Sequence, residues 1–353
     1  MTVSEIAIPP RTRALAGPTD PAPDFARRRP IGPASAASTV LALVGDTFRQ
    51  AMAGRILPIA LALAALGVAT CLSIRVEGPR TLKPDGAIEL LDGANRPLTA
   101  ALVPLGRMTL GFGLVSVGNF RDAPAQVRFL QALLARWAVG VAGILILLAG
   151  TAGILPDFLK PEAASVLLAK PVPRWLLLAG KVAGTWAFVA ALTGLFVVGT
   201  WAALGVRTGV WSTGYLATWP LLVAQFAGLH AASVVAATCT RNASASLFAS
   251  LACWMVALGT NGARDQIQTL PPSTVPPAAR AAVEAAYWAL PKPIDLSGML
   301  DRSVSASDHF AVVAEGGGPA TSRRSVALWL ASTLGFAAVM LGVAGRQLAT
   351  TDY

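Results

Sequence analysis

The chain has 353 residues, of which 54% are hydrophobic and only 13% are charged, and its mean hydropathy is +0.60. A soluble domain usually carries about a quarter charged residues, so this composition excludes an ordinary soluble protein and places much of the surface against lipid. The net charge of +10 then indicates topology and anionic-lipid contact; we expect no nucleic-acid partner, because that would need a clustered basic face.

The first 37 residues interleave prolines with a basic cluster, and their apolar content is too low to offset the entropy of ordering. We interpret 1–37 as a disordered cytoplasmic tail, either drawn to anionic headgroups or without a role. Residues 38–55 change to a helical period and predict an amphipathic helix that lies in the membrane interface before the first span. Its expected apolar face carries Leu41, Val44, Phe48, Ala51 and Met52, and its polar face carries Asp46, Arg49, Gln50 and Ala53, with Arg55 at its end.

Six apolar stretches of about 18 residues or more contain no Asp, Glu, Lys or Arg. Helices are the natural structure for them, because every backbone polar group in lipid has to be satisfied within the segment. The sequence therefore predicts an all-α polytopic membrane protein in which residues 56–353 form a six-span transmembrane domain. The predicted spans are 56–74, 137–155, 182–206, 215–239, 243–260 and 325–345.

Short loops set the expected topology. The loop 156–181 carries Lys160, Lys170, Arg174 and Lys181, against a single Arg207 in the next loop. The positive-inside rule places this loop and both termini in the cytoplasm, and it places the long loops 75–136 and 261–324 outside.

Each outer loop has a predicted structure of its own. Strand-like runs at 87–91 and 108–117 indicate a small β-containing cap in the first loop, and a helix starting at Asp122 is expected to continue into the second span. In the other outer loop, the amphipathic stretch 279–290 predicts a short helix packed back toward the outer membrane face.

The sequence lacks the usual signs of an enzyme of its own. A Gly-rich phosphate loop ending in Gly-Lys-Ser/Thr is absent, and His230 and His309 have no Cys or carboxylate at metal-ligand spacing. We therefore expect no catalytic residues, no cofactor and no metal on this chain. His230 is interpreted either as an intramembrane polar site or as a neutral imidazole bonded to a neighbouring helix.

The inner loop contains a short predicted helix. Pro161 can start it, Glu162 suits its first turn, and Pro171 must end it after about two and a half turns. A helix this short is unstable alone in water, so Val166, Leu167 and Leu168 need a partner surface, either the bilayer or another protein.

The inner-loop pattern resembles the cytoplasmic loop of ABC-2-type ABC transporter permeases, especially the multicopper-enzyme-maturation-type branch. The residues that carry this resemblance are Glu162, Leu167-Leu168, the turn Lys170-Pro171-Val172-Pro173-Arg174, and Gly180-Lys181. The segment beginning at Asp46 and containing Phe48 and Arg49, with Arg55, similarly resembles the amphipathic helix before the first span of those permeases. The basic tail and the long first outer loop are not part of the pattern.

The resemblance implies a transmembrane permease subunit in the bacterial plasma (inner) membrane, pairing with a second copy or a paralogous permease. ATP and Mg²⁺ would be bound by a separate P-loop ABC ATPase subunit, into which the helix 161–169 would dock as a coupling helix. The implied coupling interface comprises Pro161, Glu162, Val166, Leu167, Leu168, Lys170, Pro171, Arg174, Gly180 and Lys181.

Two alternatives stay open. One is an ATP-coupled mechanical or assembly module that moves no solute and acts on an outer partner through 75–136. The other, weaker one is an intramembrane enzyme that uses His230 with a Ser or Thr. The transported substrate, the direction of transport, and homodimer against heterodimer are not given by the sequence.

Overall fold

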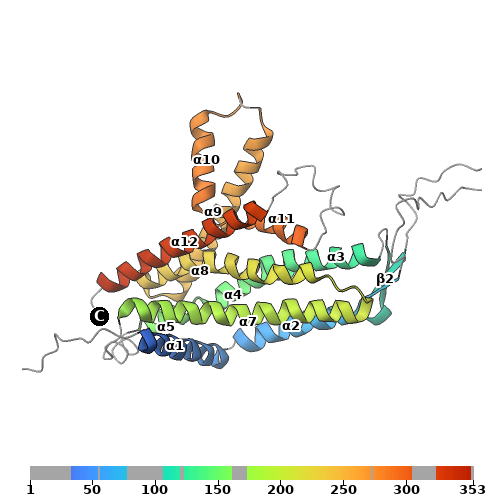
Figure 1. Ribbon diagram of the computed structural model, residues 1–353, viewed down its shortest axis with the longest axis horizontal. Coiled ribbons are helices and arrows are strands. Elements are labelled where there is room, and N and C mark those ends of the chain that lie inside the picture. The colour runs from blue at the N-terminus through green and yellow to red at the C-terminus, as the bar shows by residue number, and fades with distance from the viewer. Residues whose placement is uncertain are drawn as a thin grey trace, which may run out of the picture.

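The computed structural model shows a bundle of helices with a small sheet at one end. A helical hairpin projects from the bundle (Figure 1). The residues that it describes are 33–54, 56–77, 106–119, 123–160, 173–271, 273–303 and 323–350.

The helices before the inner loop are α1 (Pro33–Ala53), α2 (Ile56–Ser73), α3 (Ala123–Leu133), the π-helix η3 (Leu134–Gly143), α4 (Ile144–Thr151) and α5 (Ile154–Phe158). Those after it are α7 (Arg174–Thr208), the short 3₁₀ helix η4 (Thr213–Ala217), α8 (Thr218–Thr240), α9 (Ala243–Thr269), α10 (Pro277–Ala289), α11 (Pro293–Ser303) and α12 (Arg323–Thr350). The sheet has the order β1 (Arg75–Glu77), β2 (Gly106–Leu110) and β3 (Val115–Asn119), all antiparallel, with the single turn η2 (Gly111–Gly113) between β2 and β3.

Over the described residues, five helices are long and apolar enough to cross a bilayer, and the count rises to six if the bent pair α1 and α2 is one span. The predicted mostly helical, polytopic architecture is therefore confirmed at this level. Several helices extend beyond the predicted apolar spans, because charged residues can continue a helix outside the hydrocarbon. For example, α7 has 35 residues, a length of about 52 Å against about 30 Å of hydrocarbon.

The core of the bundle is built around α8, most of whose side chains are buried. The largest of the fully buried side chains come from three elements, Trp329 of α12, Tyr215 of η4 and Phe226 of α8. Helix α12 lies close against α8 at Gly228, where an added Cβ would be 2.8 Å from Cγ2 of Thr333. By contrast, α9 and α12 present most of their apolar side chains outward, which is typical of spans that face lipid.

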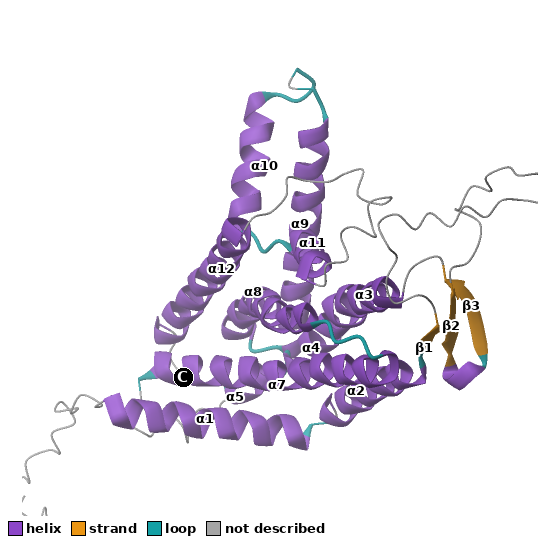
Figure 2. Ribbon diagram, turned by 45° about the vertical axis from the view of Figure 1, so that its right-hand side comes forward, coloured by secondary structure: helices purple, strands orange, loops and turns teal. Residues whose placement is uncertain are grey.

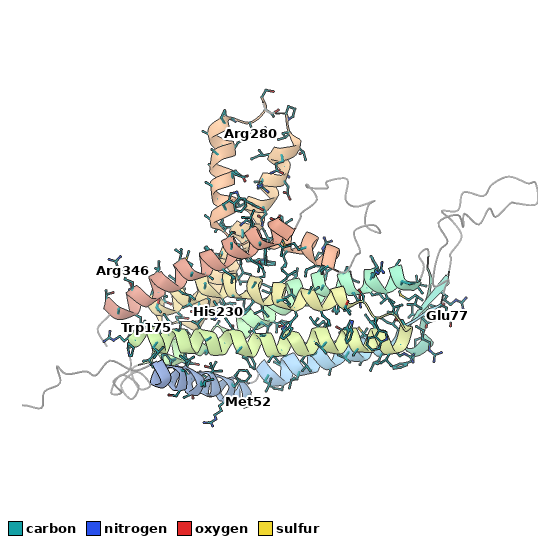
Figure 3. The ribbon with its side chains drawn as sticks, in the orientation of Figure 1. Met52, Glu77, Trp175, His230, Arg280 and Arg346 are labelled. Carbon is teal, nitrogen blue, oxygen red and sulfur yellow. The ribbon has the colours of Figure 1, made fainter. Side chains whose placement is uncertain are left out.

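Helix α1 is present over most of the predicted range 38–55, but it begins at Pro33, within the segment predicted as a disordered tail. Ala51 is buried and Phe48 packs on the core, whereas Leu41 and Met52 are exposed, and Met52 points away from the bundle (Figure 3). The predicted apolar face is thus divided between two surroundings. Part of it packs on α7, and Leu41 and Met52 remain on the exposed side, where a membrane interface would contact them.

The three-stranded sheet confirms the expected β content of the segment 75–136. The predicted run 108–117 is a hairpin and not one strand, because Gly111 and Gly113 take positive φ values of 62° and 105° and turn the chain back. The other predicted run, 87–91, lies outside the described residues, as does Asp122. The helix expected from that point does continue into the second span, from α3 through η3 to α4.

The predicted helix at 279–290 is present as α10, but it does not lie back on the bundle. It runs beside the last turns of α9, and the two stand up from the bundle as a hairpin (Figure 2). The difference arises because α9 continues from the apolar stretch 243–260 to Thr269, so α10 has a helix rather than a membrane face as its partner. Helix α11, which the sequence reading did not predict, begins at Pro293 with Asp295 in its first turn.

Candidate functional site

Most of the predicted coupling interface lies outside the described residues: Pro161, Glu162, Val166, Leu167, Leu168, Lys170 and Pro171. Three of its members, Arg174, Gly180 and Lys181, lie on the first turns of α7. The two helices that flank the loop, α5 and α7, meet the loop at the end of the bundle where α12 finishes (Figure 1). At that end, Lys160 makes an exposed ion pair with Asp157 at 2.8 Å.

A buried lysine joins the two predicted groups of site residues. Nζ of Lys181 on α7 donates to Oδ2 of Asp46 on α1 at 2.6 Å and to Oε1 of Gln50 at 3.1 Å. The Lys181 side chain is only 3% exposed, whereas that of Asp46 is 63% exposed. The ammonium also lies 5.2 Å from the ring centre of Phe158 on α5. Three elements, α1, α5 and α7, therefore meet at this one cation.

Two glycines let α1 approach α7 at this position. A Cβ added to Gly180 would lie 2.5 Å from Cδ1 of Leu43, and one added to Gly184 would lie 2.6 Å from Oγ1 of Thr47. Leu43 and Thr47 are both buried as a result. One turn further on, Phe48 packs edge-on against Phe188 at 5.7 Å between ring centres. The role of Gly180 is thus a close helix contact, which the sequence pattern did not reveal.

Arg174 links the end of the inner loop to the C-terminal turns of α12. Its Nη1 donates to the carbonyl oxygens of Leu348 and Ala349 at 3.2 and 3.5 Å. These carbonyls belong to the last turn, whose backbone acceptors have no partner within the helix. Arg49 is exposed on α1, and Arg55 lies outside the described residues.

His230 lies inside the bundle on α8 (Figure 3). Its Nδ1 accepts a hydrogen bond from Nε1 of Trp186 at 3.3 Å, and its ring stacks on Phe226 at 5.3 Å between centres. These contacts fit the interpretation of an imidazole bonded to a neighbouring helix. They provide no partner of the kind that a nucleophilic mechanism uses.

A second polar cluster, which the sequence analysis missed, lies at the base of the α9–α10 hairpin. The guanidinium of Arg264 on α9 bonds both carboxylate oxygens of Glu284 on α10 at 2.8 and 3.2 Å, and it stacks 3.8 Å from the ring centre of Tyr287. Nε1 of Trp288 donates to the same carboxylate at 2.8 Å. The bond from Arg264 lowers the pKa of Glu284 below its ordinary value. This bidentate, stacked arrangement fixes the base of the hairpin.

Lys292 lies between this cluster and α12 of the bundle. It is 1% exposed, and its ammonium lies 4.7 and 4.9 Å from the ring centres of Tyr287 and Trp288. Its Nζ donates to Ser332 of α12, and its carbonyl accepts from Nε1 of Trp329 at 3.1 Å. The hydroxyl of Tyr287 also donates to the carboxylate of Asp295 on α11, so four elements, α9 to α12, are tied together here. The chain has few charged residues, and Arg264, Glu284 and Lys292 all lie in the one region 261–324. This grouping was the sequence signal that could have indicated the cluster.

The charge on Lys292 gives a testable pH dependence. Burial lowers the pKa of Lys292 to about 8, and the positive charge of Arg264 acts in the same direction. The carboxylates of Asp295 and Glu284 oppose this shift. The pKa of Lys292 is about 8 in the folded state and 10.5 in the unfolded state, so the charged form destabilises the folded protein below pH 8. This destabilisation disappears as the pH rises from about 8 toward 10.5. The melting temperature of the wild type in detergent should therefore rise by a few degrees relative to Lys292→Met between pH 7 and pH 9.5. An unchanged difference between the two proteins would contradict this.

An apolar groove of about 370 Å³ opens between α2, α4 and α7. Leu63, Leu66 and Phe196 line it, and the hydroxyls of Thr70 and Thr193 at its wall already bond their own helix carbonyls. Over the parts of the chain that the structure describes, no group of three or more His, Cys, Asp or Glu side chains is placed to hold a metal ion. No protein-family model, curated protein or solved structure matches this chain.

Proposed function

We propose that this chain is the transmembrane permease subunit of an ABC transporter, of the ABC-2 type that its inner loop resembles. A separate P-loop ABC ATPase would hydrolyse ATP with Mg²⁺ and dock on the loop 156–181. A second copy or a paralogous permease would complete the membrane part. The substrate would be exported or otherwise translocated across the plasma membrane.

The contact of Lys181 with Asp46 is the observation that most supports this proposal. A docked motor needs a firm connection from its coupling loop to the spans that move. Lys181 lies eight residues beyond Pro173, the last residue before α7, and it ties α7 to α1. Arg174 ties the same end of α7 to α12. A push on the loop would therefore reach three helices at once, and ATP-driven closure of the motor would shift the permease between arrangements.

Affinity purification of the full chain from its own membranes tests the proposal. A P-loop ATPase with a Walker A sequence should copurify, and reversing the loop charge with Glu162→Lys should reduce its recovery several-fold. Arg346→Glu is the matched control, because Arg346 is exposed on the last turns of α12 at the same end as Trp175 of α7 (Figure 3). It changes the charge at this end and leaves the loop sequence unchanged.

Arg174→Glu belongs in the same experiment but needs a second readout. Because Arg174 also bonds the end of α12, its reversal is expected to lower the melting temperature as well as ATPase recovery. Glu162→Lys should lower recovery alone. If the wild type brings no P-loop ATPase, or if neither loop variant changes its recovery, the proposal is wrong.

A further inference from the structure

The three-stranded sheet has one apolar and one polar face. In its register, Val76 and Val117 both pair with Met108, and Leu110 pairs with Val115, so these five side chains share a face. The opposite face carries Arg75, Glu77, Arg107, Thr109 and Ser116. Glu77 points away from the helices (Figure 3), so the polar face is turned to the outside and the apolar face toward the bundle.

Only part of the apolar face has protein beneath it. Val76, Met108 and Leu110 pack into a cluster with Cys71 and Ile74 at the end of α2. The next strand, β3, does not join this cluster over the described residues, and both of its apolar side chains on this face, Val115 and Val117, are about half exposed, at 55% and 48%. Strand β3 therefore extends beyond the edge of the bundle. Its apolar face points in the same direction as the apolar face of β1 and β2, which packs on the bundle.

The turn between β2 and β3 extends this overhang. Phe112 is 77% and Leu114 is 90% exposed, the most exposed of the large apolar side chains described. Phe112 takes φ +57°, a left-handed conformation that is uncommon for a bulky side chain. The amide of Gly111 donates to Oγ of Ser73 at 3.1 Å, which holds the turn beside the last turn of α2.

The position of the turn matches the edge of a bilayer. Helix α2 has 18 residues, a length of about 27 Å, which is close to the hydrocarbon thickness of about 30 Å, so an α2 that spans the membrane places Ser73 at its boundary. Leu72 is exposed on the same turn of α2. Val210, at the end of α7, packs in the cluster beneath the sheet, and the neighbouring Trp211 is exposed, as expected of an interfacial aromatic.

We propose that the overhang, defined as Phe112, Leu114, Val115 and Val117, inserts into the bilayer leaflet on the side of the α2 C-terminus. The apolar face of the sheet has two parts. Protein covers the part that packs on Cys71 and Ile74, and lipid covers the overhang. The polar face stays in water. This interaction needs only that α2 spans the membrane, and it is independent of the proposed transport function.

Depth-dependent quenching tests this inference on the full chain in phosphatidylcholine vesicles. Phe112→Cys is labelled with an environment-sensitive fluorophore in a variant in which Cys71, Cys239 and Cys253 are replaced by alanine. Lipids with a nitroxide near the headgroup end of the acyl chain should quench the label several-fold more than they quench the same label at Ser116→Cys. Ser116 is the matched control, because it lies on the polar face of the same hairpin.

Three outcomes are decisive. Strong quenching at 112 and at Leu114→Cys with weak quenching at 116 supports lipid insertion. Equal, weak quenching at all three positions overturns it. Weak quenching with a blue-shifted label at 112 and efficient cross-links between chains also overturns it, because the overhang would then contact a second copy. Labelled proteins with unchanged melting temperatures exclude misfolding as the cause of any result.

Discussion

Asp46→Ala is expected to destabilise the protein by about 1–3 kcal/mol, although Asp46 is the exposed member of its ion pair. Its removal leaves the Lys181 ammonium buried with only Gln50 and the ring of Phe158 as partners. Lys181→Met, in contrast, should cost less than about 1 kcal/mol, because methionine fills a similar volume and the abandoned carboxylate is in water.

The double variant gives this prediction its sharpest form. In the Lys181→Met background, Asp46→Ala should cost almost nothing, so a double-mutant cycle should give a large coupling. Thermal melting of the purified chain in mild detergent measures each variant. Arg49→Ala, one turn along the same helix and exposed, is the control and should change stability by less than about 0.5 kcal/mol. A double variant as unstable as Asp46→Ala alone would show that the pair is not what binds α1 to α7.

Gly184→Ala is expected to cost about 1–3 kcal/mol through overpacking. The new Cβ would meet Oγ1 and Cβ of Thr47 at 2.6 and 2.8 Å and the backbone Cα of Val44 at 3.2 Å. A side-chain rotation of Thr47 cannot relieve the clash with backbone, so α1 has to move away from α7. At Gly180 the closest atom is the mobile end of Leu43, so Gly180→Ala should cost less.

Gly335→Ala is the matched control for the glycine series. Gly335 lies within α12, another long apolar helix, and an added Cβ there would have no atom within 4 Å. Alanine should be neutral or stabilising by up to about 1 kcal/mol at that position. Equal effects of the substitution at Gly184 and Gly335 would mean that α1 does not pack closely on α7.

The apolar stretches were predictable because lipid tolerates almost no charge within a span. Their helical extensions were not, since nothing in 261–269 marks whether a helix continues into water. Helix α10 was predicted from its own period, but its partner was not, because helix pairing depends on residues far apart in the sequence. The part of α1 that packs on α7 was not predicted for the same reason, since it depends on residues of α7 that are far away in the sequence.

The candidate site shows the same division. Lys181 and Asp46 were both named from local patterns, yet their contact joins positions 135 residues apart and has no local signature. Gly180 was named as part of the loop motif, whereas its contact with Leu43 explains it through packing. The cluster of Arg264, Glu284 and Lys292 was missed because its members meet only when α10 packs beside α9, a pairing that the sequence did not predict.

The central claim is that the inner loop binds an ATPase, and a photoreactive amino acid in place of Leu167 tests it most directly. Irradiation of intact membranes should cross-link the full chain at position 167 to a P-loop ATPase. The same probe in place of Trp211, at the opposite end of α7, should form no such product. A probe at 167 that cross-links only to lipid, or that captures an ATPase no more often than the probe at 211, would contradict the proposed coupling role and with it the assignment of this chain as an ABC permease.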